Sequence, residues 1–363
     1  MRIRKTTLIL GLAIGCLSLS AQGTSVPYTP GTTQDAVSYW LPKTKLKVTV
    51  TTSRNTFKPG EFSRYAERYL RLSDVKDKAE EVWEITGITV SAYGIPDKDQ
   101  LYTLNFPAKG KRPYFVLTND GIIESVNTHA PEEPSEPAPI TTNQEKGEKT
   151  NPQDYMTEEI LMAGSTAKMA ELTAKEIYNI RESRNSITRG QADYIPTDGE
   201  STVYILEYLT EQENALLTLF TGTSDTQEHI FTIDVNPDEP LTKQILFRFS
   251  AKLGVLPVDN LAGEPVWIDI TDRNMIKGQA IENDSGKTKV LRKKEKGPFL
   301  YYRIPGRAEV KIYNNRKSFT EEDVQIAQFG KVEVVSSTVM GKHAHTKIVF
   351  DTTTGNIKSI NDK

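Results

Sequence analysis

The sequence predicts an α+β fold, with two antiparallel β-rich regions (each a sandwich or a partial barrel) and a central two-helix hairpin. Three observations predict it. On both sides of the middle of the chain, short segments alternate apolar and polar residues, which is the period of a half-buried strand. Between them, residues 155–222 carry apolar residues at steps of three and four, the period of an amphipathic helix. No strand–helix–strand unit is recognisable, so the sheets are expected to be antiparallel.

The first helix of the hairpin is predicted from Met156 to Ile187. One face carries six apolar residues, four of which are alanines: Ile160, Ala163, Ala167, Ala170, Ala174 and Ile177. Small side chains let another element approach the helix axis closely. We therefore expect this face to be buried against other protein segments.

The second helix is predicted to begin after Asp198, an N-cap residue with Glu200 in the first turn, and to end at Gly222. Its apolar face consists of Leu206, Leu209, Leu216, Leu217 and Phe220. Two long helices joined by a short connection usually pack antiparallel.

Composition limits the possible functions. The chain has 363 residues, which is room for about two domains, and a formal net charge of −3. Three basic residues, Arg2, Arg4 and Lys5, lie in the predicted signal region, so the mature chain would be near −6. The densest basic run, residues 292–296, is interrupted by Glu295 and reads as a solvated loop. A nucleic-acid partner is therefore not expected.

The N-terminus predicts export. Three basic residues precede an apolar run from Thr6 to Leu19, which is typical of a secretory signal peptide over residues 1–20. Cleavage after Ser20 would give a soluble exported protein. Alternatively, Ala13 to Cys16 is similar to a bacterial lipobox and would place a lipid anchor at Cys16. Because Cys16 is the only cysteine, no intramolecular disulfide and no cysteine-based zinc site is expected.

The N-terminal β-rich domain is predicted over residues 26–129. Leu46, Val48 and Val50 alternate with polar residues and indicate a half-buried strand. The apolar parity switches at Gly87, as a bulge or a turn would produce. Asn119-Asp120-Gly121 between two apolar runs predicts a hairpin.

A proline-rich segment, residues 130–154, is predicted to be a disordered or extended linker, because it has too few apolar residues to form a core. The helical hairpin follows over 155–222 and a C-terminal β-rich domain over 223–363. In that domain Pro305-Gly306 predicts a tight turn and Thr354-Gly355-Asn356 a hairpin turn. Whether the two β-rich regions form one domain or two is open at this stage.

Several sequence strings suggest a family when they are taken in order. They are Phe62-Ser-Arg-Tyr-Ala-Glu-Arg-Tyr-Leu70, Ile177-Tyr-Asn-Ile-Arg-Glu-Ser-Arg184, Pro196-Thr-Asp-Gly-Glu200, Leu217-Thr-Leu-Phe-Thr-Gly222, Leu246-Phe-Arg-Phe-Ser250, Tyr302-Arg-Ile-Pro-Gly306 and Ala327-Gln-Phe-Gly330. The chain resembles the exported Bacteroidetes proteins grouped as domain of unknown function 4831. The resemblance implies a location in the cell envelope, in the periplasm or at the outer membrane, and it carries no catalytic residues with it.

Two patterns could carry chemistry. Ser165 and Lys168 match the S-x-x-K of penicillin-recognising serine enzymes, but Lys287-Thr288 is followed by lysine instead of the glycine of a K-T-G strand. We therefore interpret them as ordinary helix surface. His343 and His345 would share one face of a strand, and an exposed pair is a better interpretation than a metal site.

A third pattern is a charged cluster around the loop of the hairpin: Arg181, Glu182, Arg184, Asp193, Asp198 and Glu200. It could form an anion or sugar cleft. We favour a structural ion-pair network that fixes the hairpin against a sheet, because buried arginines need carboxylate partners.

The sequence assigns no catalytic, cofactor-binding or metal-binding residue. Runs such as Glu158-Glu159 or Glu321-Glu322-Asp323 carry no weight among 48 acidic residues. The expected function is a non-catalytic binding or structural module of the cell envelope, with an envelope protein or a glycan as its partner and no cofactor. The alternative is a hydrolase acting on glycan or peptide in the periplasm or at the cell surface.

Overall fold

The computed structural model describes residues 31–32, 36–105, 113–129, 151–193, 198–273, 300–335 and 346–361. The predicted signal peptide with Cys16, most of the predicted linker, Lys287 to Lys289, the basic run 292–296, and His343 and His345 lie outside the described residues.

The described strands form three sheets. The first contains β1 (Gly31–Thr32), β2 (Ala36–Lys58), β3 (Glu80–Asn105) and β6 (Thr223–Val235), with β2 between β3 and β6. The second has the order β11 (Ser318–Val335), β10 (Leu300–Tyr313), β9 (Glu264–Asp272), β7 (Leu241–Ser250) and β8 (Gly254–Leu256). The third has the order β13 (Ile357–Asn361), β12 (Lys347–Phe350), β5 (Ile123–Val126) and β4 (Phe115–Leu117).

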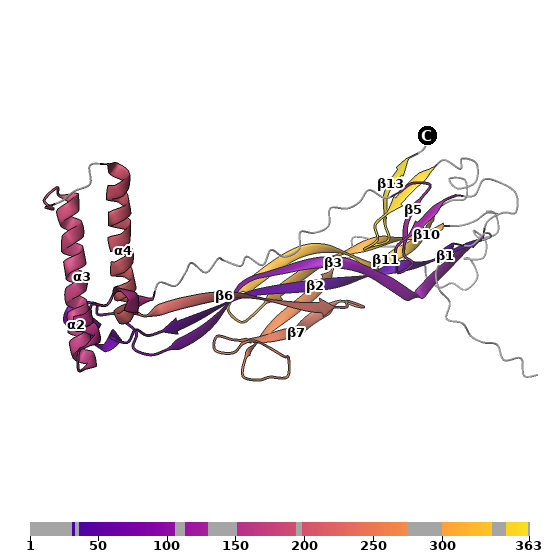
Figure 1. The fold of residues 1–363 in the computed structure, drawn as a ribbon. Helices are drawn as coiled ribbons and strands as arrows, with labels where there is room; N and C mark the ends of the chain where they lie inside the picture. Colours follow the sequence, from indigo (N-terminus) through magenta and orange to yellow (C-terminus); the bar gives the residue numbers. More distant parts are fainter. Residues whose placement is uncertain are drawn as a thin grey trace, which may run out of the picture.

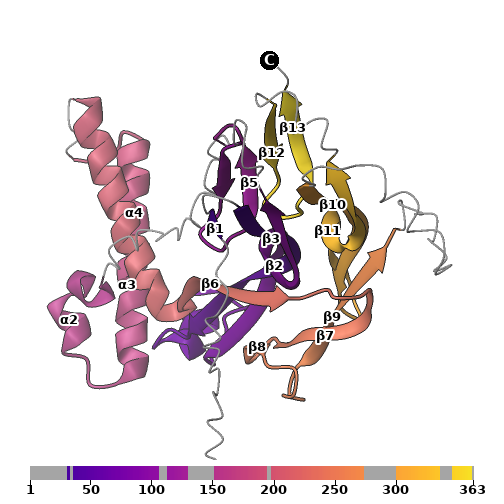
Figure 2. The ribbon, with the colours of Figure 1, turned by 90° about the vertical axis from the view of Figure 1, so that its right-hand side faces the viewer.

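All pairings between these strands are antiparallel, and helices are the minority, so the predicted α+β fold class is confirmed. The first and third sheets each combine strands from the N-terminal and the C-terminal β-rich regions. The two regions therefore build shared sheets (Figures 1 and 2).

The helices are η1 (Ser63–Tyr65), α1 (Ala66–Leu70), η2 (Pro152–Tyr155), α2 (Glu158–Leu161), α3 (Thr166–Thr188) and α4 (Gly199–Thr221). The helices α3 and α4 form a hairpin at one end of the molecule, where the long strands β2, β3 and β6 reach it (Figure 1). In Figure 2 the second sheet lies on the other side of β2 and β3 from this hairpin.

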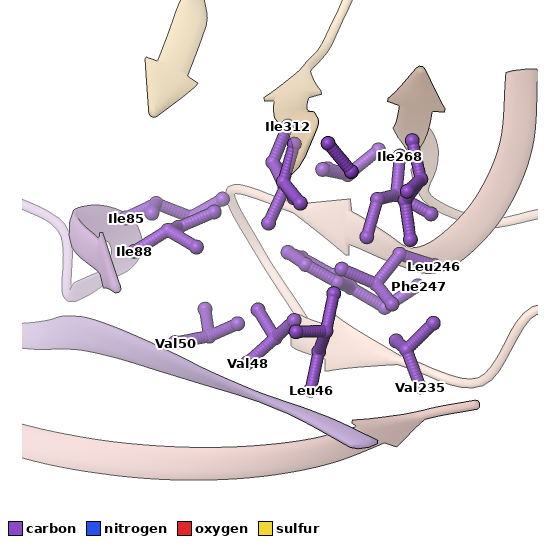
Figure 3. Close-up of a cluster of buried hydrophobic side chains, with 14 of the residues drawn as sticks. Leu46, Val48, Val50, Ile85, Ile88, Val235, Leu246, Phe247, Ile268 and Ile312 are labelled. Atoms are coloured by element: carbon purple, nitrogen blue, oxygen red, sulfur yellow. The ribbon is translucent and has the colours of Figure 1, made fainter. Parts of the chain in front are cut away.

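The larger core lies between the first and second sheets. Leu46, Val48 and Val50 of β2 are fully buried and point toward Ile268 and Ile312 (Figure 3). A second cluster joins the other half of β2 to the third sheet through Val37, Tyr39, Leu41, Ile123, Val126, Ile348 and Phe350. One long strand thus belongs to both cores, and its alternating sequence supplies the apolar face for each.

The predicted irregularity at Gly87 is a β-bulge. Thr51 pairs with Gly87 and Thr52 pairs with Ile85, so Thr86 is an extra residue on β3. The bulge resets the side-chain parity, which allows both Ile85 and Ile88 to be buried in the same core.

The predicted turn at Pro305-Gly306 is wrong. These residues lie inside β10, where the register with β11 shifts between Ile304 and Gly306. A Cβ on Gly306 would meet the Phe329 carbonyl oxygen at 2.6 Å, so glycine here permits close passage of two strands. The dipeptide marks a strand irregularity because its neighbours on both sides pair with the same partner strand.

The predicted first helix is also divided. Residues 156–187 contain α2 and α3, and a break around Gly164 separates them. Ser165 is the N-cap of α3, and its hydroxyl accepts from the Lys168 N–H. Pro152, placed in the linker by the sequence, lies in η2, which Asn151 caps.

Candidate binding groove on the helical hairpin

A small apolar core holds the hairpin together and attaches it to the long strands. Ala170, Ala174 and Ile177 of α3 are buried and form part of a contact surface, whereas Ala163 and Ala167 of the predicted face are only half-buried. It packs in one cluster with residues of η1, α1 and α4: Phe62, Ala66, Leu70, Leu216 and Phe220. This close packing fixes α4 relative to the strands.

The ends of α4 lie where the sequence predicts them. The Asp198 carboxylate accepts from the Ser201 N–H at 2.6 Å. This hydrogen bond from the backbone lowers the pKa of Asp198, since it stabilises the charged form. At the other end Gly222 has φ +79°, a conformation that favours glycine.

Three charged residues join α3 to α4. Glu213 is 6% exposed, and its two oxygens lie 2.6 Å from Arg181 Nε and from Arg184 Nη1. The predicted ion-pair network therefore exists, but it joins the two helices and does not fix the hairpin to a sheet. Its acidic partner, Glu213, was not among the predicted residues.

The other members of the predicted cluster have separate positions. Asp198 caps α4, while Glu182, Asp193 and Glu200 are exposed. Both arginines contact Glu213 between the helices, so among the described residues the predicted cluster is not gathered into an anion or sugar cleft.

The groove runs along the face of α4 that lies beside η2 and the start of β6. It encloses about 1040 Å³ and its walls are mostly apolar. It is lined by Asn151 and Pro152 beside η2, by Thr223 and Ser224 of β6, and by eight residues of α4: Val203, Leu206, Glu207, Thr210, Glu211, Asn214, Ala215 and Thr218. These α4 residues recur at steps of three and four, so they form one stripe of the helix surface.

Tyrosines extend this surface beyond the groove. Tyr155 packs edge-on against Tyr208 with ring centroids 6.2 Å apart. Desolvation, followed by the nearby Glu211 carboxylate, raises the pKa of Tyr155. Tyr204 and Val203 are exposed on the adjoining turn of α4. An apolar stripe with exposed aromatic rings at its border is a common feature of protein interaction sites.

The segment that contains α4 and β6 is acidic in sequence. Residues 190–242 contain no Lys or Arg, although the whole chain has 45. The same 53 residues contain eleven acidic residues: Asp193, Asp198, Glu200, Glu207, Glu211, Glu213, Asp225, Glu228, Asp234, Asp238 and Glu239. Among the described residues that line the groove, Glu207 and Glu211 are the charged ones.

The predicted S-x-x-K pair does not form a catalytic arrangement. Ser165 caps α3 with its oxygen, and Lys168 Nζ lies 2.8 Å from Glu171 Oε1 on the exposed side of the same helix. The hydrogen bond to Glu171 raises the pKa of Lys168, which is the opposite of what a lysine base requires.

A second hollow lies between the start of β3 and the turn that joins β10 to β11. It encloses about 460 Å³ and contains Trp83 and Phe319. Three of its charged residues contact one another or a ring: Arg316 Nη2 is 2.8 Å from Glu264 Oε1, and Lys317 lies over the Phe319 ring. Within the described parts of the chain, no group of His, Cys, Asp and Glu could hold a metal ion.

The fold and the groove together define a mostly β-stranded α+β protein with a helical hairpin that presents an apolar, acid-rimmed surface. The chain belongs to the family described as Domain of unknown function (DUF4831), whose model matches residues 35–358. No curated protein and no solved structure matches the chain. Among the described helices, none has the length and hydropathy needed to cross a membrane.

Proposed function

We propose that this protein is a non-catalytic binding module of the cell envelope, and that the groove along α4 captures an amphipathic helix of a partner protein. The observation that carries the proposal is the groove itself: about 1040 Å³, mostly apolar, and placed on a hairpin that has its own packed core. A preformed apolar groove binds tightly because little ordering entropy is lost on binding.

The dimensions favour a helix as the ligand. The lining residues of α4 run from Val203 to Thr218, which corresponds to about 22 Å of helix length. A partner helix of about 15 residues would match it and would insert apolar side chains at steps of three and four. A glycan is a poorer match, because sugars need many hydrogen-bonding groups and these walls are mostly apolar.

The charge favours a basic partner. Glu207 and Glu211 border the groove, and no Lys or Arg is present between residues 190 and 242. Lysines or arginines on the flanks of the bound helix would lie near these carboxylates, which increases the association rate and the specificity. Residues 1–20, as a signal peptide, would bring the protein to the periplasm or the outer membrane, where such a partner would be met.

The test uses two model peptides of 15 residues with leucines at helical spacing. One has lysine at the remaining positions and the other has glutamate. We expect the lysine peptide to bind more tightly in a fluorescence anisotropy titration. Val203→Lys, which places a cation in the groove, should weaken binding of the lysine peptide about tenfold, corresponding to about 1.4 kcal/mol, because it removes an apolar contact and repels the peptide lysines.

A matched control is Leu161→Lys. Leu161 and Val203 are each 54% exposed, but Leu161 lies on α2 and does not line the groove. It should bind the lysine peptide within about twofold of the wild type, which is less than 0.5 kcal/mol. Equal weakening by both substitutions, or no preference for the lysine peptide, would contradict the proposal.

A further inference from the structure

The outer edge of β6 has no partner strand among the described residues. β6 pairs with β2 over 13 consecutive residue pairs, from Leu46 with Val235 to Lys58 with Thr223, without a register shift. No strand of the described residues pairs with its opposite edge. A long regular edge presents a row of N–H and C=O groups to any extended chain that approaches it.

The other sheet edges are shorter or interrupted. β1, β4, β8 and β13 have five residues or fewer. The pairing of β3 with β2 has two register shifts, and the Trp83 N–H on β3 already donates to Ala251. The pairing of β11 with β10 also shifts twice. Among the described edges, β6 is the one with a long unbroken register.

The sequence of β6 lacks three of the usual protections of an edge strand, and its charged residues are all acidic. Residues 223–235 contain no Pro, no Gly and no Lys. Phe231 and Ile233 belong to the larger core but are only partly buried, because β6 is the last strand on that side of the first sheet. An added strand would cover these two side chains and extend the core.

The acidic side chains of β6 favour a partner strand with basic residues. Its ionised side chains are Asp225, Glu228 and Asp234, with no Lys or Arg. Pairing with the β6 of a second copy would place these carboxylates close to one another, which is unfavourable. A partner strand that alternates apolar and basic residues would be complementary on both faces.

We propose that β6 accepts an extended segment of a partner polypeptide, with alternating apolar and basic residues, as an additional strand of the first sheet. The site is separate from the helix-binding groove and does not depend on it. The two are adjacent, however, since Thr223 and Ser224 begin β6 and also line the groove. One partner could therefore place a helix along α4 and continue as a strand along β6.

The test is amide hydrogen exchange of the full-length protein with a seven-residue peptide of alternating valine and lysine. The expected result is slower exchange within residues 223–235, by about tenfold when the peptide is at ten times its Kd. A peptide with the same sequence, N-methylated at alternate amides on its pairing edge, should give no protection, because it cannot form the ladder hydrogen bonds.

Two variants form a matched pair. Ile230→Lys adds a positive charge to β6, and Val332→Lys adds one to β11, and the original residues are 40% and 38% exposed. Only Ile230→Lys should weaken the binding of the peptide, by about tenfold. Equal protection by the N-methylated peptide, protection at β11 in place of β6, or concentration-dependent protection of β6 without peptide would each overturn the proposal. The last result would assign the edge to a second copy. The helix-binding test measures the effect of a substitution at Val203, which is not part of β6. Either proposal can therefore fail while the other holds.

Discussion

Glu213 on α4 accepts a hydrogen bond from Arg181 on α3, with Oε1 and Nε 2.6 Å apart, and this contact joins residues 32 positions apart in sequence. The other oxygen of the same carboxylate binds Arg184. The buried carboxylate lies between the apolar base of the hairpin and its more exposed far half.

Arg181→Ala should lower the free energy of unfolding by about 1–2 kcal/mol, because a charge-assisted hydrogen bond is lost at a carboxylate that has little access to water. The loss is limited because Arg184 remains and because about a third of the Arg181 side chain is exposed. Thermal unfolding followed by circular dichroism measures it.

Glu213→Ala should cost more than Arg181→Ala, since it leaves two cations without their partner. Glu182→Ala, on the exposed side of α3, is the control, and it should change the free energy of unfolding little. A midpoint for Arg181→Ala that equals that of the wild type within error would show that the network is not structural.

Gly60 sets the attachment of the hairpin to the strands. A Cβ at this position would overlap the backbone of Leu219 on α4, and the nearby Phe62 N–H donates to the Leu219 carbonyl at 2.7 Å. Gly60→Ala should therefore destabilise the protein by about 1–3 kcal/mol through forced backbone shifts. Far-UV circular dichroism during denaturation is the suitable measurement, because it reports the helices.

Gly164→Ala is the matched control for Gly60→Ala. Nothing lies within 4 Å of a Cβ at Gly164, so the change should stay within about 0.5 kcal/mol of the wild type. Equal effects of the two substitutions would mean that the contact of Gly60 with α4 is unimportant for stability.

The burial of Tyr39 should make the stability of the folded protein sensitive to alkaline pH. Its phenol is fully buried, donates to the Tyr301 carbonyl at 3.0 Å and accepts from the Tyr301 N–H at 2.8 Å. Burial raises the pKa of Tyr39 well above the ordinary value of about 10. The unfolded chain then releases this proton at a lower pH than the folded one. The stabilisation is complete below about pH 10 and is lost as the pH rises toward the folded pKa.

Tyr39→Phe should be less stable than the wild type at neutral pH by about 1–2 kcal/mol, because the Tyr301 backbone loses both partners. The difference should shrink above pH 10 by up to about 1.4 kcal/mol per pH unit. Urea denaturation at a series of pH values measures it. Tyr114→Phe, at an exposed site, should follow the wild type at each pH. A constant difference between Tyr39→Phe and wild type would contradict the burial argument.

The features that the sequence predicts correctly depend on local physics. Alternation at Leu46, Val48 and Val50, the parity switch at Gly87 and the caps Asp198 and Gly222 each express a preference that neighbouring residues determine. The pairing of strands across sheets does not appear in such patterns. Periodicity tells which face of a strand is buried, but it does not identify the strand that lies beside it.

The candidate groove was harder to foresee for the same reason. Val203, Tyr204 and Tyr208 lie off the predicted apolar face of α4, and they could have indicated a second contact surface on that helix. The absence of Lys and Arg between residues 190 and 242 is also visible in the sequence, and it indicates an acidic surface. The role of Glu213 required the helix pairing itself, because its arginines lie on another helix.

Ser165 allows the binding interpretation to be separated from the hydrolase alternative. Ser165→Ala removes the N-cap of α3 and should cost about 1 kcal/mol, while Ser165→Asp keeps a capping oxygen and should remain close to the wild type. Lys168→Met breaks only an exposed ion pair with Glu171 and should cost less than about 0.5 kcal/mol. A fluorescent penicillin, which acylates the serine of S-x-x-K enzymes, provides the second measurement. If the wild type were labelled and Ser165→Asp were not, Ser165 would be a nucleophile. We expect equal, background labelling of both proteins, because the Ser165 oxygen accepts a hydrogen bond at the helix end and Lys168 is held by Glu171.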